Sequence, residues 1–143
     1  MALNAQGKVD EAAKELEIAC RLAPREAEYR YKFALALNEL GKPAEAMTAL
    51  EEAVKLDPQF ARAWYNLGLV YSQTGQSDRA LDALIRAESI DALSARIPYA
   101  RATILARLGR HREARIAARR ALELDPAFSD AATMLQNLEA ESK

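Results

Sequence analysis

The chain has one histidine and one cysteine, and these are its clearest candidates for nucleophilic or metal-binding chemistry. Cys20 and His111 lie far apart in the sequence, and a nucleophile needs a base within hydrogen-bonding reach. The sequence also has no glycine-rich phosphate loop, no dinucleotide fingerprint and no HExxH zinc motif. We therefore expect no catalytic residue, no cofactor and no metal site, and we do not expect an enzyme.

A second kind of chemistry, the recognition of anions, is indicated by the arginines. Eight of them lie between residues 95 and 128 with only three acidic residues, so this segment carries +5 and the rest of the chain −6. Arg112, Arg115 and Arg119 are spaced i, i+3 and i+7, which places them on one face of a helix. This basic patch could bind an acidic or phosphorylated partner. The alternative is a solvated helix face, and without nearby aromatic residues for stacking we expect no nucleic-acid partner.

The composition points to one domain with a continuous core. The chain has 143 residues, of which 50% are hydrophobic, and a net charge of −1. That charge gives no reason to expect binding to nucleic acid or to anionic lipid. There is no uncharged apolar run of membrane-spanning length and no basic-then-apolar leader, so we expect neither membrane association nor secretion, and a cytoplasmic location by default.

Residue types recur every 34 positions along the chain. The recurring types are a glycine between two predicted helices, two small residues where paired helices approach closely, and a proline that ends the second helix. The positions are Gly7, Gly41, Gly75 and Gly109; Ala12, Ala46, Ala80 and Ala114; Ala19, Ala53, Ala87 and Ala121; and Pro24, Pro58 and Pro126.

The clearest copy is the stretch Trp64–Tyr71, followed by Ala80 and Leu84. It resembles the tetratricopeptide repeat (TPR) pattern W-x2-L-G-x2-Y…A-x3-F. The resemblance covers the whole chain and implies an all-α, right-handed superhelix of antiparallel helix pairs. We expect a single array made of a partial repeat (1–26), three full repeats (27–60, 61–94 and 95–128) and a C-terminal capping helix (129–143).

The first and last repeats depart from this pattern. In the first, we expect a helix from Val9 to Leu22 after a loop at Gly7, with its apolar side partly uncovered and with Cys20 in the core. In the last full repeat, Pro98 should lie in the first turn of its helix. Arg101 takes an inward position, so it should reach solvent or pair with an acidic neighbour such as Asp82 or Glu88.

The TPR resemblance implies a peptide-binding groove lined by the first helix of each repeat. The predicted groove residues are Tyr31, Leu35, Asn38, Arg62, Tyr65, Asn66, Leu69, Gln73, Arg96, Tyr99 and Thr103. The three tyrosines recur every 34 residues and offer flat apolar area to a ligand, and Arg62 and Arg96 could bind carboxylates. Alternatively, the tyrosines pack between neighbouring repeats.

The resemblance implies a scaffold or adaptor that binds a peptide or protein segment. The two-carboxylate clamp that some TPR modules use for chaperone tails is not expected, because only Asn66 matches it in kind and Arg96 in part. A competing hypothesis is a structural array, a homo-oligomer that forms through the groove or the uncovered N-terminal repeat. A third is that the chain is the interaction segment of a larger protein.

Overall fold

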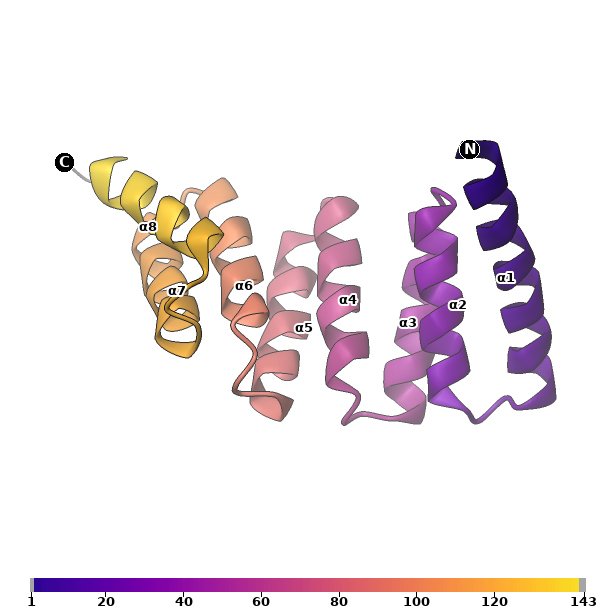
Figure 1. Cartoon of the computed structure of the whole chain (residues 1–143). Coiled ribbons are helices and arrows are strands. Elements are labelled where there is room, and N and C mark those ends of the chain that lie inside the picture. Colours follow the sequence, from indigo (N-terminus) through magenta and orange to yellow (C-terminus); the bar gives the residue numbers. More distant parts are fainter. Residues whose placement is uncertain (1, 142–143) are drawn as a thin grey trace.

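The computed structural model describes residues 2–141, and within this range the chain forms eight helices and no strand. The helices are α1 (Ala2–Leu22), α2 (Ala27–Glu39), α3 (Pro43–Leu56), α4 (Ala61–Gln73), α5 (Ser77–Ile90), α6 (Arg96–Arg107), α7 (His111–Leu124) and α8 (Ser129–Glu141). They stand side by side in a row, in chain order, from α1 at one end to α8 at the other (Figure 1). None of these helices is long and apolar enough to cross a membrane.

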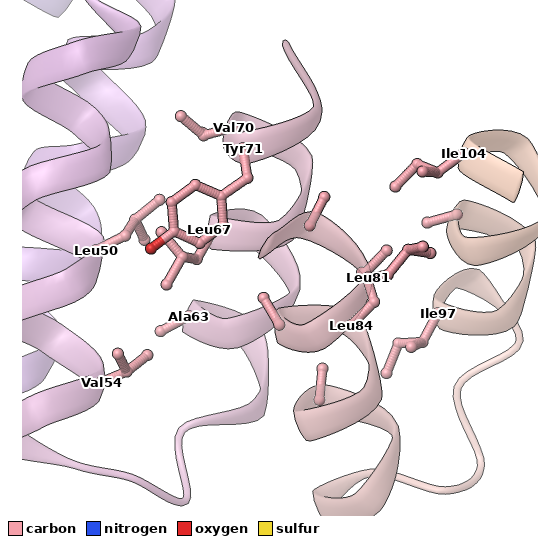
Figure 2. Packing of buried hydrophobic residues seen from close by; sticks show 14 of the residues in the cluster. Leu50, Val54, Ala63, Leu67, Val70, Tyr71, Leu81, Leu84, Ile97 and Ile104 are labelled. Carbon is pink, nitrogen blue, oxygen red and sulfur yellow. The ribbon is translucent and has the colours of Figure 1, made fainter. Parts of the chain in front are cut away.

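The helices pack as consecutive pairs around one continuous core. Helix α2 packs against α3, α4 against α5, and α6 against α7, and the second helix of each pair also contacts the first helix of the next. Figure 2 shows Leu67 of α4 and Leu84 of α5 inside this core, with Leu50 of α3 on one side and Ile97 of α6 on the other. The all-α array of helix pairs predicted from the 34-residue spacing is therefore confirmed.

The recurring alanines and glycines explain how paired helices come so close. Ala46, Ala80 and Ala114 are all completely buried at the crossings. A Cβ atom added to Gly68 of α4 would lie 2.8 Å from Leu84 Cγ, closer than side chains normally approach. The second glycine role is in the loops: Gly41, Gly75 and Gly109 have φ of 76°, 79° and 77°, a region that favours glycine.

The expectation for the first repeat was wrong in one respect. Gly7 was predicted to lie in a loop before a helix from Val9 to Leu22, but α1 runs unbroken from Ala2 to Leu22. Gly7 lies inside it, and a Cβ atom added there would have no neighbouring atom within 4 Å. Glycine inside a helix costs only about 1 kcal/mol relative to alanine, so the residue type alone does not end a helix. The apolar side of α1 is partly uncovered, as expected, since Ala12 on that side is only half-buried.

Cys20 of α1 and the unusual residues of the last full repeat lie as expected. Cys20 is 6% exposed, and burial raises the pKa of its thiol. Pro98 is the third residue of α6, in its first turn, and is fully buried. Arg101 pairs with Glu88 of α5, with 2.8 Å between Nη1 and Oε1. The division of the chain into repeats at residues 27, 61, 95 and 129 stays a prediction.

Candidate functional site

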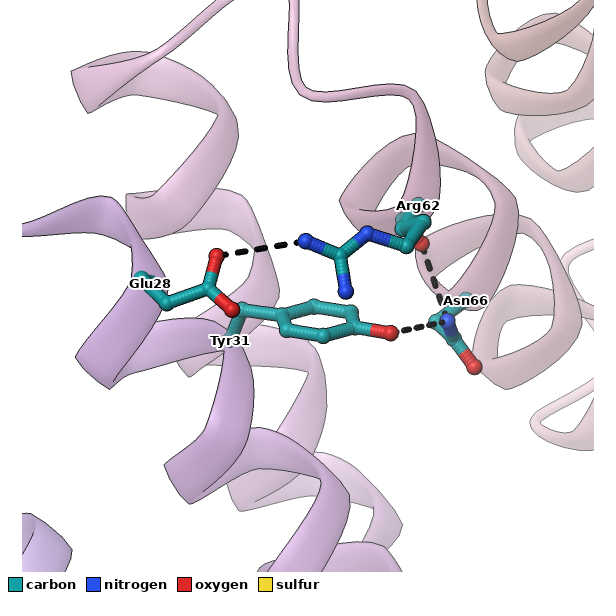
Figure 3. A network of polar contacts seen from close by, with 4 residues as sticks. All are labelled: Glu28, Tyr31, Arg62 and Asn66. Carbon is teal, nitrogen blue, oxygen red and sulfur yellow. Dashed lines mark hydrogen bonds and ion pairs between the residues drawn. The ribbon is translucent and has the colours of Figure 1, made fainter.

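Helices α2, α4 and α6 contact one another through side chains and form one face of the array, which we call the A face. Arg62 of α4 forms an ion pair with Glu28 of α2, with 3.4 Å between Nη2 and Oε2. One turn further along α4, the Asn66 Nδ2 group donates hydrogen bonds to the Tyr31 hydroxyl (3.3 Å) and to the Arg62 carbonyl (2.9 Å). Figure 3 shows these four side chains between the two helices.

All eleven predicted groove residues lie on these three helices, but they differ in exposure. Tyr31 is buried. The half-buried residues are Leu35, Asn38, Tyr65, Asn66, Leu69, Tyr99 and Thr103, and the exposed residues are Arg62, Gln73 and Arg96. Since a ligand can contact only what is accessible, α4 and α6 offer more of this set than α2 does.

Tyr31 packs between repeats, which is the alternative that the sequence left open. It is 8% exposed, and its ring lies 4.9 Å from the ring of Phe60. The guanidinium carbon of Arg62 lies 5.2 Å from the centroids of both rings. Tyr31 therefore presents little surface to a ligand, whereas Tyr65 and Tyr99 keep part of their surface accessible.

The two arginines predicted to bind carboxylates have different surroundings. The charge of Arg62 is partly balanced by Glu28. Arg96 lies over Tyr65, with 5.4 Å from its guanidinium carbon to the ring centroid, and has no acidic partner within residues 2–141. Cations over aromatic faces are held in place by the ring quadrupole. Arg96 thus forms no ion pair on the A face, although Asp91 lines the same depression.

Two depressions lie along this face. The smaller has a volume of about 140 Å³ and is lined by Tyr65 and Arg62 of α4, by Arg96 and Ile97 of α6, and by the loop before α6. The larger, of about 500 Å³, lies between α6 and α8 next to Tyr99. Both depressions therefore include residues predicted for the groove.

The larger depression includes residues of α8 that were not predicted as a site, because this helix was interpreted only as a cap. They are Asp130, Thr133, Met134, Asn137, Leu138 and Glu141. The 34-residue spacing could have predicted these residues, since it relates Asp130 to Arg96 and Thr133 to Tyr99. The A face therefore continues from α6 onto α8.

The predicted basic patch on α7 is only partly available. Arg119 pairs with Glu139 of α8, with 3.4 Å between Nη2 and Oε1. Arg112 is exposed and Arg115 half-buried, and neither has an acidic partner among the described residues. The capping helix thus neutralises the end of the patch nearest to it.

The stacked helix pairs, positive-φ glycine loops and one face of repeated side chains define a helical-repeat protein. Three family models match the sequence: a TPR repeat at residues 34–75, and tetratricopeptide repeats at residues 61–92 and 99–128. Together they cover more than half of the chain, which belongs to the tetratricopeptide repeat family. A comparison with curated protein sequences finds no match.

Solved structures share the fold at low sequence identity. A crystal structure of MamA superposes with a TM-score of 0.91 at 24% identity, covering 97% of this chain and 81% of the other. The type III secretion chaperone SycD of Yersinia enterocolitica, in complex with a peptide of the translocator YopD, gives 0.78 at 23% identity, with 81% and 94% covered. YrrB, described as a TPR protein with an unusual peptide-binding site, gives 0.80 at 23% identity, with 91% and 67% covered.

Proposed function

We propose that the chain is a non-catalytic protein-interaction module that binds a peptide or protein segment on the A face, along α4, α6 and α8. The observation that carries the proposal is the smaller depression, where Tyr65 is left partly uncovered beside Arg96. An accessible tyrosine gives apolar contact area at low entropic cost, and an arginine that forms no ion pair can bind a carboxylate. Two proteins of the same fold, SycD and YrrB, are described with peptides or a peptide-binding site, which is consistent with this use of the fold.

The proposal is tested by selecting binders from a random peptide library displayed on phage. Selected peptides are then measured by isothermal titration against the Arg62→Glu/Tyr65→Ala double variant. We expect the Kd to rise at least tenfold, because this variant removes the uncovered ring and reverses a neighbouring charge. Circular dichroism should show unchanged helicity, so that the loss is assigned to the surface and not to unfolding.

A matched double variant on another face serves as the control. Arg112→Glu/Ile116→Ala changes one arginine and one exposed apolar residue on α7, where Ile116 is 61% exposed. Binding should be unchanged in this variant. If binding instead depends on the α7 residues and not on those of α4, the A face is not the binding site and the basic patch is.

Self-assembly is a second candidate function, favoured by the incomplete cover of α1. Ile18 is 52% exposed and Leu22 is 81% exposed on this helix. Burial of such apolar area against a second copy would be favourable. Light scattering over a hundredfold range of concentration tests this candidate, which a constant monomer mass would eliminate.

A further inference from the structure

Two tyrosines of the A face each contact the phenylalanine that immediately precedes a later helix, Phe60 before α4 and Phe128 before α8. The Tyr31 ring lies 4.9 Å from the Phe60 ring at an interplanar angle of 44°, and Tyr99 lies 4.8 Å from Phe128 at 39°. This near-identical geometry recurs two repeats apart. The same shift pairs Tyr65 with Ser94, and among the described residues the middle tyrosine has no ring contact of this kind.

The backbone turn before α6 also differs from the turns before α4 and α8, because Pro98 follows Ser94 by four residues. The Phe60 carbonyl accepts a hydrogen bond from the Trp64 backbone N–H at 3.1 Å, and Phe128 accepts one from Ala132 at 3.1 Å. In the repeat between these two, the residue equivalent to Trp64 and Ala132 is Pro98, which has no N–H to donate. The Ser94 carbonyl instead accepts from the Ile97 N–H at 3.3 Å.

The small depression lies where the missing ring would be. Its lining includes Tyr65, Ser94 and Ile97, and Ile97 is 3% exposed. The arginine cover is retained: Arg96 lies 5.4 Å from the centroid of Tyr65, as Arg62 lies 5.2 Å from that of Tyr31. The tyrosine and the arginine are thus retained, whereas Ser94 replaces the phenylalanine and Ile97 replaces the smaller Ala63 and Ala131 of the other two junctions.

The size of the depression fits one phenyl ring. Its volume of about 140 Å³ is close to that of an apolar protein cavity of roughly 150 Å³ that binds benzene. Unlike that cavity, the depression is open, and its lining includes Arg62, Asp91 and Arg96 beside Tyr65 and Ile97. A ring in this position would meet Tyr65 in the tilted arrangement that aromatic pairs favour. An aliphatic side chain would fill the space less completely and lacks the aromatic edge.

We propose that the depression between Tyr65, Ser94 and Ile97 binds a phenylalanine side chain of a peptide lying on the A face. The ring takes the place against Tyr65 that Phe60 and Phe128 take against Tyr31 and Tyr99. This inference rests on the proposed peptide-binding function and names the side chain that the site selects.

The test uses N-acetyl-L-phenylalaninamide as the probe and N-acetyl-L-leucinamide as the matched control. Each is titrated into the ¹⁵N-labelled protein, and the backbone amide shifts are followed by NMR. We expect saturable shifts centred on Tyr65, Ser94 and Ile97, with a dissociation constant at least threefold lower for the phenylalanine probe. The Ser94→Phe variant, which supplies the ring from the chain itself, should lose these shifts and melt at a higher temperature than the wild type.

A second variant separates filling of the depression from a general effect of adding phenylalanine. Ser89→Phe places the same ring at an exposed position on α5, and this variant should keep the wild-type response to the probe. Equal affinity for the two amides, shifts centred elsewhere, or an undiminished response in Ser94→Phe would each overturn the inference.

Peptides from the library separate failure of this inference from failure of the proposed function. Selected peptides should carry phenylalanine at one fixed position and should bind Ser94→Phe at least tenfold more weakly. Peptides that depend on Arg62 and Tyr65 but lack the phenylalanine, and that still bind Ser94→Phe, would overturn only the inference about the ring. Peptides that ignore the Arg62→Glu/Tyr65→Ala change would overturn the proposed function, while the amide titration still reports on the depression itself.

Discussion

Gly68 is the position where the packing of α4 on α5 allows the least additional volume. A Cβ atom at this site would lie 2.8 Å from Leu84 Cγ, 3.0 Å from Leu84 Cδ2 and 3.2 Å from the Ala80 carbonyl oxygen. Carbon atoms prefer separations of roughly 3.5 to 4.0 Å. Leu84 is completely buried, and its Cγ lies near the backbone rather than at a flexible end. The helices must therefore move apart to admit even a methyl group.

The expected effect of Gly68→Ala is the difference between two opposing contributions. Alanine is favoured over glycine inside a helix by about 1 kcal/mol. Overpacking of a well-packed core typically costs about 1 to 3 kcal/mol, and the contact below 3 Å places this site toward the upper end. We expect a net loss of about 1 to 2 kcal/mol in the free energy of unfolding, measured by urea denaturation followed by circular dichroism.

Gly7→Ala is the matched control, because Gly7 also lies inside a helix but has no atom within 4 Å of an added Cβ. This change should stabilise the protein by about 0.5 to 1 kcal/mol. The two glycine-to-alanine changes should thus have opposite signs. If Gly68→Ala is as stable as the wild type or more stable, the close approach of α4 to α5 at this position is wrong. The double variant Gly68→Ala/Leu84→Ala should lose less stability than the sum of the two single changes, because the new methyl group occupies vacated space.

Two further predictions concern polar groups in the core. The Tyr71 hydroxyl donates a hydrogen bond of 2.8 Å to Glu51, and burial together with this bond raises the pKa of Tyr71 to about 12. This pKa exceeds the value of about 10 in the unfolded chain, so the protonated Tyr71 hydroxyl stabilises the folded state fully below pH 10. That stabilisation, about 2 kcal/mol in the free energy of unfolding, is lost between pH 10 and 12. Urea denaturation across this range should show the loss in the wild type but not in Tyr71→Phe. Arg101→Met should lower the free energy of unfolding by about 1 to 3 kcal/mol, because Glu88 then keeps a partly buried charge without its cation. Replacing both Arg101 and Glu88 by methionine should recover most of that loss, and a double variant less stable than Arg101→Met would contradict this reasoning.

The fold was predictable because the information that specifies it repeats. Each 34-residue shift tests the same requirement again, so that Ala46, Ala80 and Ala114 together indicate a helix crossing although a single alanine indicates nothing. Predictions from the 34-residue spacing fail where the conformation of a residue depends on more than its residue type. Gly7 has the residue type of Gly75, yet it lies inside α1 whereas Gly75 lies in a loop with φ of 79°.

The site was less predictable because the exposure of a side chain depends on its contacts with neighbouring repeats. Tyr31 and Tyr65 occupy equivalent positions in the sequence, yet Tyr31 is buried and Tyr65 is half-buried. Tyr65 has Ser94 where Tyr31 has Phe60, but Tyr99 is half-buried although it contacts Phe128, so the exposure of a tyrosine depends on all its neighbours and not on one equivalent residue. The basic patch shows the same limit, since Arg119 is paired by a glutamate of α8 that no spacing within α7 reveals.

The junction of α5 and α6 shows how the two sides of a repeat array respond to a departure from the pattern. Arg101 points a charge toward the interior, where an unpaired charge is costly, and Glu88 of the preceding helix neutralises it within the chain. Ser94 removes a ring from the A face and leaves an open depression that a ligand can reach. The two departures therefore differ in where a partner can lie, because Arg101 is paired within the chain whereas the depression is open to a partner from outside. The depression beside Tyr65 and Arg96 is accordingly where binding specificity can arise, at the cost of the ring contact that Ser94→Phe is expected to restore.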